Sequence, residues 1–126
     1  MNSKIEDLFS SSVIKYIRSE IASSNENEVF FVGEINHDGK VTSVSVGSRG
    51  NLHSVPVNQD LKRKGSVLIH NHPGGNPSPS VCDKEITERI SQAGEMLGIC
   101  LLDHIIIGDQ RYVSFREQGL LDEYPV

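Results

Sequence analysis

The sequence contains no tryptophan, and aromatic residues fill only 6% of its 126 positions, so aliphatic side chains have to build most of any core. Its two cysteines, Cys82 and Cys100, are too few for the disulfide scaffold of a small secreted protein. No apolar run approaches the roughly 20 residues that cross a bilayer, and the N-terminus MNSKIEDLFSSS lacks the pattern of a signal peptide. We therefore expect a cytoplasmic globular protein with no membrane partner, while its oligomeric state stays open.

Basic charge is also scarce. The chain has 12 Lys and Arg residues against 17 Asp and Glu residues, which gives a net charge of −5. Proteins that grip nucleic acids usually present a basic face, because contacts to phosphates dominate their affinity. The one basic cluster, at 62–64, falls near the end of an expected short helix, where it complements the helix dipole. We therefore expect no nucleic-acid partner.

The pattern of the chain is that of a single α/β domain. Helical spacing of apolar residues over 3–22 predicts an N-terminal helix, and a second helix is expected from Ser80 until Gly98 closes it. The other expected elements are strands at 28–36, 41–46, 52–57 and 66–72, an Asp-Gly turn at 37–40, a short helix at 58–64, and two strands in CLLDHIIIG and RYVSF. Strands and helices mix without strict alternation, which predicts a mixed sheet.

The residues suited to chemistry gather at the end of the strand at 66–72. His70 and His72 are separated by one residue, so both project to the same side of a strand while Asn71 points the other way. Two imidazoles placed in this way can reach one metal ion, although an isolated H-x-H is more often a pair of ordinary histidines. A Gly/Pro/Ser loop then leads into the helix whose first turn carries Asp83. Two nitrogens and one carboxylate oxygen would leave a tetrahedral zinc ion one position for water, which is the open arrangement of a catalytic site.

Ser80 and Asp83 also have a purely local explanation. S-x-x-D at the start of a helix resembles a capping box, although Glu or Gln is the usual residue at the last position. By themselves the two residues favour this explanation. The two roles are compatible, because a cap fixes the Ser80 hydroxyl, which in an active site could donate a hydrogen bond to a developing oxyanion.

The full pattern resembles a known family. H-N-H at 70–72, the loop PGGNPSP and S-V-C-D at 80–83 look like the signature of JAMM/MPN-plus metallopeptidases. The strings HNHPGGNPSPSVCDKEIT and LGICLLDHIIIGDQRYVSF are similar to the RadC branch of that superfamily, and the resemblance covers about residues 28–119. It implies a curved mixed β-sheet flanked by helices, with the layout also seen in cytidine deaminases. On this basis the single domain, 1–126, divides into an N-terminal helix at 1–22, a metal-site core at 28–119 and a tail at 120–126.

The resemblance also implies an activity. A zinc ion held by His70, His72 and Asp83 would activate a water that cleaves a peptide or isopeptide bond. The substrate would be a protein or peptide, and a ubiquitin-like protein is one option. The family needs a glutamate as general acid and base, and Glu28 and Glu34 are the candidates. Their even separation puts both on the same face of a strand, so spacing alone does not choose between them. The family places this glutamate just before the apolar run of the strand, which favours Glu28.

In the implied mechanism, Glu28 takes a proton from the water and returns it to the leaving amine, while zinc and Ser80 stabilise the oxyanion. Asp103 and His104 lie in the string that matches the RadC branch. Either this pair braces a metal ligand from behind, or Asp103 fixes a local turn. The sequence does not decide between the two.

RadC-type proteins usually carry a helix-hairpin-helix segment ahead of the metal domain, and we expect none within these 126 residues. The stretch before His70 is also shorter than the family leads us to expect. Two alternatives to an amide hydrolase therefore stay open. One is a zinc-bearing binding module with little turnover, and the other is a DNA-repair accessory domain, which the acidic balance disfavours.

Overall fold

The structure is a computed structural model, and it describes residues 3–24, 28–49, 66–97 and 101–121. Its elements are β1 (Ser3–Lys4), the 3-10 helix η1 (Ile5–Asp7), α1 (Ser11–Ala22), β2 (Val29–Ile35), β3 (Val41–Arg49), β4 (Ser66–Asn71), α2 (Val81–Leu97), β5 (Leu101–Ile107) and β6 (Arg111–Ser114). The strand expected at 52–57, the short helix at 58–64 and its basic cluster lie outside the described residues.

The described strands form one six-stranded sheet in the order β1-β6-β5-β4-β2-β3. β4 and β5 pair in parallel, and every other neighbouring pair is antiparallel. The helix α2 is therefore the crossover between the two parallel strands, as such a connection requires. The predicted mixed sheet of the α/β class is confirmed.

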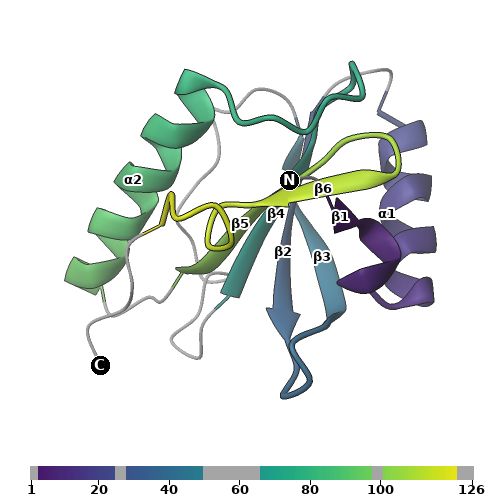
Figure 1. The fold of residues 1–126 in the computed structure, drawn as a ribbon, viewed down its shortest axis with the longest axis horizontal. Helices are drawn as coiled ribbons and strands as arrows, with labels where there is room; N and C mark the ends of the chain where they lie inside the picture. Colours follow the sequence, from purple (N-terminus) through teal and green to yellow (C-terminus); the bar gives the residue numbers. More distant parts are fainter. Residues whose placement is uncertain (1–2, 25–27, 50–65, 98–100, 122–126) are drawn as a thin grey trace.

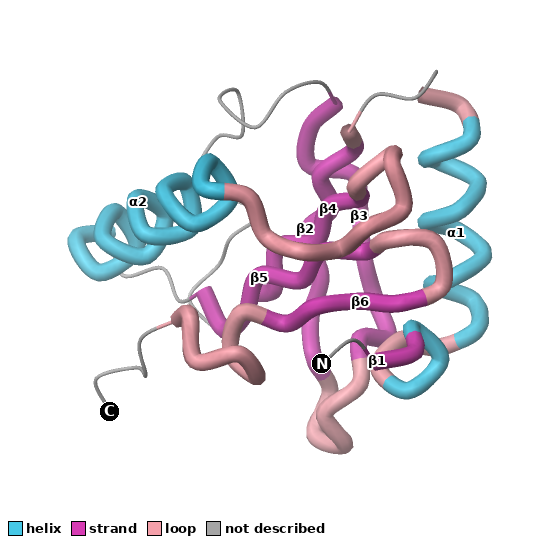
Figure 2. Tube along the Cα trace, turned by 45° about the horizontal axis from the view of Figure 1, so that its top comes forward, coloured by secondary structure: helices cyan, strands magenta, loops and turns pink. Residues whose placement is uncertain are grey.

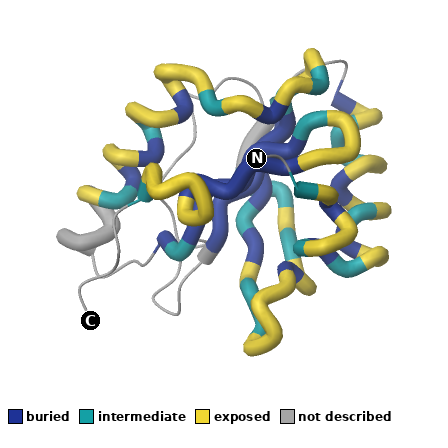
Figure 3. The backbone as a smooth tube through the Cα atoms, in the orientation of Figure 1, coloured by how far each residue is buried: buried dark blue, intermediate teal, exposed yellow. Residues whose placement is uncertain are grey.

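The sheet lies between the two helices, with α1 on one side and α2 on the other (Figures 1 and 2). Buried residues concentrate in the central strands, whereas the outer faces of both helices are exposed (Figure 3). Side chains along β4 alternate between the two sides, since Val67 and Ile69 join the apolar cluster beneath α1, while Leu68 joins the cluster beneath α2. The next residue on the α2 side is His70. The end of β4 thus presents a histidine to the space between the sheet and α2.

The hairpin between β2 and β3 forms as the sequence predicts. Gly39 adopts φ +82°, which a residue with a side chain rarely does, and the Asn36 side chain accepts hydrogen bonds from the amides of Asp38 and Lys40. Ser43 and Ser45 are exposed while Val44 and Val46 pack on the cluster beneath α1, so the predicted alternation is confirmed.

The N-terminal helix begins later than predicted. The apolar spacing indicated a helix from about residue 3, but α1 starts at Ser11, after Ser10 caps it by accepting a bond from the Val13 amide at 3.4 Å. The preceding residues instead pair with β6 as the short strand β1 and then form one 3-10 turn. Pairing with a distant strand outweighs the local helical spacing here.

The helices of the structure can be compared with the requirements of a membrane-spanning helix. Neither of the described α-helices combines the length and the apolar character that a membrane-spanning helix needs.

Candidate metal centre

Three elements bring the predicted site residues together. His70 lies on β4 and His72 directly after it, and β2 runs antiparallel beside this strand with Phe30 opposite His70. Glu28 precedes β2, so this register carries it to the level of His72. The first turn of α2 supplies Asp83. One end of the sheet therefore meets the start of the helix that follows it.

The Asp83 carboxylate lies between the two imidazoles. Nε2 of His70 is 3.2 Å from Oδ1 of Asp83, and Nε2 of His72 is 3.0 Å from Oδ2. The His70 side chain is fully buried, whereas 17% of the His72 side chain is exposed. The centre is thus closed behind His70 and open to solvent beside His72.

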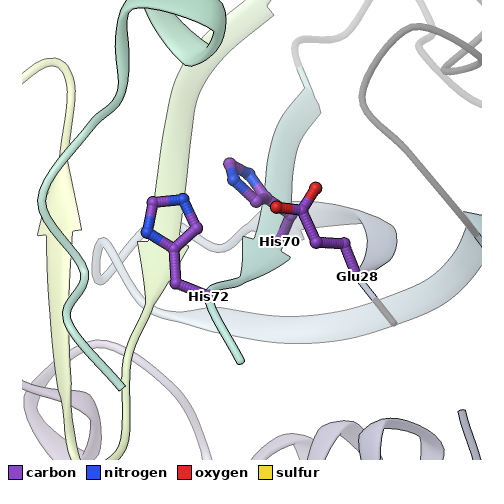
Figure 4. A group of neighbouring side chains, drawn as sticks. All are labelled: Glu28, His70 and His72. Atoms are coloured by element: carbon purple, nitrogen blue, oxygen red, sulfur yellow. The ribbon is translucent and has the colours of Figure 1, made fainter. Parts of the chain in front are cut away.

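Glu28 completes the group. Its carboxylate points towards the histidine rings from the neighbouring strand (Figure 4), and one ligand atom each of Glu28, His70 and His72 lie within 4.8 Å of one another. Glu34 does not reach the centre: it is exposed and pairs with Ser43 near the other end of β2, six residues or roughly 20 Å along the strand. The structure therefore brings one of the two candidate glutamates to the histidines and leaves the other outside.

Ser80 and Asp83 form the capping box that the local explanation expects. The Asp83 amide donates to Ser80 Oγ at 3.0 Å, and the Ser80 amide donates to Asp83 Oδ2 at 2.8 Å. Asp83 still faces both histidines through the same carboxylate. The cap and the ligand roles are thus compatible, because the cap orients the carboxylate towards the centre.

The loop between β4 and α2 is held by a close approach to the end of β5. A Cβ atom on Gly108 would lie 2.2 Å from the carbonyl oxygen of Gly75 and 2.8 Å from Pro77, so a side chain at this position has no room. The His72 amide donates to the Ile107 carbonyl at 2.9 Å in the same region. These contacts hold the loop that leads from His72 to α2 against the end of β5.

The donor set fits a transition-metal ion such as zinc. His70 Nε2 is fully buried and makes no hydrogen bond despite its 3.2 Å distance to Asp83, so a polar atom is left without a partner. Buried polar atoms normally have one, and a cation between the two atoms would supply it. Two imidazole nitrogens with carboxylate oxygens suit zinc better than the all-oxygen sites of calcium or magnesium. The residues of the centre therefore fit a metal ion of this kind.

The electrostatics favour an ionised Asp83. Burial alone would raise the pKa of Asp83, but the imidazoles of His70 and His72 and the Ser80 amide hold it well below its usual range. The hydrogen bond to Asp83 raises the pKa of His72, and the Asn76 carbonyl and the Glu28 charge act in the same direction against burial. The carboxylate is thus available as an anion to a cation.

The second ring nitrogen of each histidine is also held. His72 Nδ1 lies 2.9 Å from the carbonyl oxygen of Asn76, and His70 Nδ1 lies 2.8 Å from Nε2 of His104. The other nitrogen of His104 contacts the Thr87 hydroxyl on α2. Burial lowers the pKa of His104 well below its usual value, so this ring is neutral. Asn76 and Thr87 did not stand out in the sequence; the one available signal for Thr87 was its place four residues after Asp83, on the same helix face.

The predicted pair Asp103 and His104 divides into two roles. Only His104 contacts a predicted ligand. Asp103 points to the other face of β5, where it accepts bonds from the His104 and Arg116 amides at 2.8 and 2.9 Å and from the Ser114 hydroxyl. Its carboxylate thus fixes the local backbone of β5 and of the turn after β6, in line with the local explanation.

A groove lies on the α1 side of the sheet, and His72 is the one proposed metal ligand among its lining residues. It has a volume of about 480 Å³ and runs between α1, through Ile14, Ile17 and Ile21, and the loop that contains His72 and Gly75. The wall on the α1 side is therefore largely aliphatic.

Comparison with known proteins agrees with this geometry. Residues 9–120 match the family described as the RadC-like JAB domain. The chain is 44% identical over 91 residues to a UPF0758 protein of Desulfitobacterium hafniense, covering 68% of this chain and 40% of that relative. It is 54% identical over 82 residues to a UPF0758 protein of Thermotoga maritima (63% and 37%), and 43% identical over 105 residues to one of Trichlorobacter lovleyi (77% and 46%). The chain thus spans less than half the length of these relatives. It belongs to the RadC-like JAB domain family.

Proposed function

We propose that this domain is a zinc-dependent hydrolase of amide bonds, a metallopeptidase or isopeptidase. The observation that carries the proposal is the convergence of two histidine Nε2 atoms on one buried carboxylate, with a second carboxylate beside them. His70, His72 and Asp83 are the proposed ligands, and Glu28 is the proposed general acid and base. Zinc bound by these three residues would lower the pKa of a water towards ~7 and polarise a carbonyl group.

The position of Glu28 supports its role in proton transfer. It lies beside both histidines yet keeps partial exposure, so it can contact both a water at the centre and a substrate. In the reaction Glu28 accepts a proton from the attacking water and donates it to the departing nitrogen. The second step is needed because an amide anion is a very poor leaving group.

The capping box supports a role for Ser80. Its Oγ accepts the bond from the Asp83 amide, which fixes the hydroxyl at the edge of the centre. A hydroxyl that accepts through a lone pair still has its proton to donate. Ser80 would donate this proton in a hydrogen bond to the oxyanion that develops on the carbonyl oxygen of the substrate.

The groove supports a polypeptide as the substrate. It is lined by isoleucines of α1 and by His72, a surface suited to an aliphatic side chain of a polypeptide. We therefore propose a protein or peptide substrate, and a ubiquitin-like tail is one polypeptide of this kind. A zinc-bearing binding module is the alternative that the experiment has to separate from an enzyme.

The test begins with metal content and then measures cleavage. The wild-type chain is expected to hold about one zinc ion, measured by mass spectrometry of the metal, and His72→Ala is expected to lose it. Zinc-loaded protein is then incubated with peptides from a digested proteome, and new peptide termini are counted. Glu28→Gln should retain zinc but slow cleavage by about 10²–10⁴-fold. Glu34→Gln, the matched change on the same strand, should behave as wild type.

Two results would contradict the proposal. Wild-type protein that stays metal-free when zinc is supplied would remove its basis. Zinc-loaded wild-type protein that produces no new termini, or Glu28→Gln protein that cleaves at the wild-type rate, would leave the binding module as the better explanation.

A further inference from the structure

A buried chain of hydrogen bonds runs from α2 through β5 to β4. It links Thr87, His104 and His70, whose exposed fractions are 2%, 0% and 0%. Water therefore cannot supply alternative partners for these groups. Because each group has a fixed number of protons, the direction of every hydrogen bond in the chain can be assigned.

The assignment starts at Thr87. Its hydroxyl has one proton and donates it to the carbonyl oxygen of Asp83 at 2.6 Å, an oxygen that can only accept. Towards the His104 ring, Thr87 Oγ1 is then left with lone pairs alone. His104 must therefore carry its proton on Nδ1 and donate it to Thr87.

The direction continues to the proposed metal ligand. A neutral His104 with its proton on Nδ1 has a lone pair on Nε2, which lies 2.8 Å from His70 Nδ1. His70 must therefore donate from Nδ1, and its Nε2 is left as a lone pair that faces Asp83 Oδ1. This assignment agrees with the absence of a hydrogen bond at His70 Nε2.

His72 also donates from Nδ1, by a simpler route, while its Nε2 lies 3.0 Å from Asp83 Oδ2 and shares a hydrogen bond with it. Its Nδ1 faces the Asn76 carbonyl oxygen at 2.9 Å, which can only accept, so Nδ1 has to be the protonated nitrogen. Both histidines thus donate from Nδ1 and direct Nε2 at the centre. For His72 a backbone carbonyl fixes the Nδ1 proton, whereas for His70 this proton depends on two other side chains.

We infer that Thr87 and His104 are positioning residues that set the tautomer of His70 and so keep its Nε2 free to bind a metal. The inference rests on the metal site of the proposed function and names the residues that prepare it. Neither residue touches the metal or the substrate. Thr87 also ties the state of His70 to the helix turn that carries Asp83, so the two ligands are prepared by one connected group.

The inference predicts a specific effect of removing the Thr87 hydroxyl. In Thr87→Val the side-chain volume is kept, but His104 Nδ1 loses its acceptor. The tautomer of His104 with the lowest free energy is then the one that carries its proton on Nε2 and donates it to His70 Nδ1. His70 would in turn carry its proton on Nε2 and donate it to Asp83, and a metal ion would have to displace this proton.

The experiment uses the full chain with matched variants on α2. Thr87→Val removes the hydroxyl, Thr87→Ser keeps it, and Ser91→Ala removes a buried hydroxyl that makes no hydrogen bond, one turn further along the helix. The tautomer of His70 is read in the metal-free protein by long-range ¹H–¹⁵N correlation spectra. Zinc affinity is measured by competition with a chromophoric chelator.

We expect His70 to be protonated on Nδ1 in the wild type, Thr87→Ser and Ser91→Ala, and on Nε2 in Thr87→Val. We also expect zinc affinity to fall about 10- to 100-fold in Thr87→Val alone. The inference is overturned if Thr87→Val keeps the wild-type tautomer and affinity, or if Ser91→Ala changes both as much.

The failure of this inference and that of the proposed function can be told apart. The tautomer is measured without zinc or substrate, so the result stands whether or not the protein cleaves an amide bond. Conversely, a Glu28→Gln variant that cleaves at the wild-type rate would contradict the proposed function and leave the tautomer of His70 unaffected.

Discussion

The two faces of β4 carry opposite chemistry on one backbone. Val67 and Ile69 point towards α1, Leu68 and His70 point towards α2, and all four are buried with exposed fractions of at most 1%. Among the described residues, the α1 side holds a cluster of twelve buried apolar residues, whereas the apolar cluster on the α2 side has four. The α2 side fills the remaining space with Asp83, Thr87 and two buried histidines.

The α1 side of the sheet thus contributes mainly to stability, and the α2 side carries the polar residues of the candidate site. Burial of apolar area is the main favourable term in folding, so the α1 side should supply most of it. Buried polar groups contribute little unless every one is paired, and removing a partner is costly. The α2 side can hold a metal centre because the opposite side of the same strands keeps the sheet folded.

The largest expected effect compares two neighbouring residues on β4. Ile69→Ala leaves a cavity beneath α1 and should lower the free energy of unfolding by about 2–5 kcal/mol, with zinc content unchanged in the folded protein. His70→Ala should abolish zinc binding. Chemical denaturation and metal analysis measure the two properties. The comparison fails if folded Ile69→Ala protein loses its zinc, or if His70→Ala protein retains it.

A smaller effect follows from removing the metal. An ion that binds only the native state stabilises it by RT ln(1 + [Zn]/Kd), about 2.7 kcal/mol at a hundredfold excess over Kd. A chelator should therefore lower the Tm of the wild type and of Ile69→Ala by similar amounts. His70→Ala serves as the control, because its Tm should not respond. An equal response in all three proteins would mean that zinc acts elsewhere on the chain.

Local patterns predicted the parts of the site that lie close together in the sequence. One intervening residue placed His70 and His72 on one side of β4, and S-x-x-D marked the start of α2. The choice between Glu28 and Glu34 was different, because spacing within one strand treats them alike. The antiparallel register that sets Phe30 opposite His70 brings Glu28 to the histidines. Spacing along one strand does not determine that register.

Contacts between distant elements account for what the sequence did not predict. The role of Thr87 depends on β5 lying parallel to β4, so that His104 stands between α2 and His70. A threonine that bonds to a carbonyl one turn back is common in helices, so its place four residues after Asp83 does not mark Thr87 as part of a site. The late start of α1 has the same origin, because residues 3–4 pair with β6 instead of extending the helix. In each case a pairing between remote segments outweighs the local pattern.

Asp83 and Asp103 are both buried, but their pKa values are shifted in opposite directions. On the α2 side, the imidazoles lower the pKa of Asp83 against the effect of burial. Asp103 lies on the opposite face of β5 from His104, and there burial raises its pKa although Ser114 and two backbone amides act against this. One face thus favours the carboxylate anion, and the other disfavours it.

The smallest expected effect is a change in how stability depends on pH in Asp103→Asn. Because the folded-state pKa of Asp103 is raised, the unfolded chain ionises first as the pH increases, and the wild type should lose stability between the ordinary aspartate pKa and the raised one. An amide oxygen at this position can still accept from the His104 and Arg116 amides, and its NH₂ can donate to Ser114. The variant should therefore fold and lack this decline, so that it gains on the wild type as the pH rises. Urea denaturation of metal-free protein at several pH values measures the difference. If the variant instead falls further behind the wild type with rising pH, the Asp103 anion stabilises the fold, and the two faces do not differ in the way proposed.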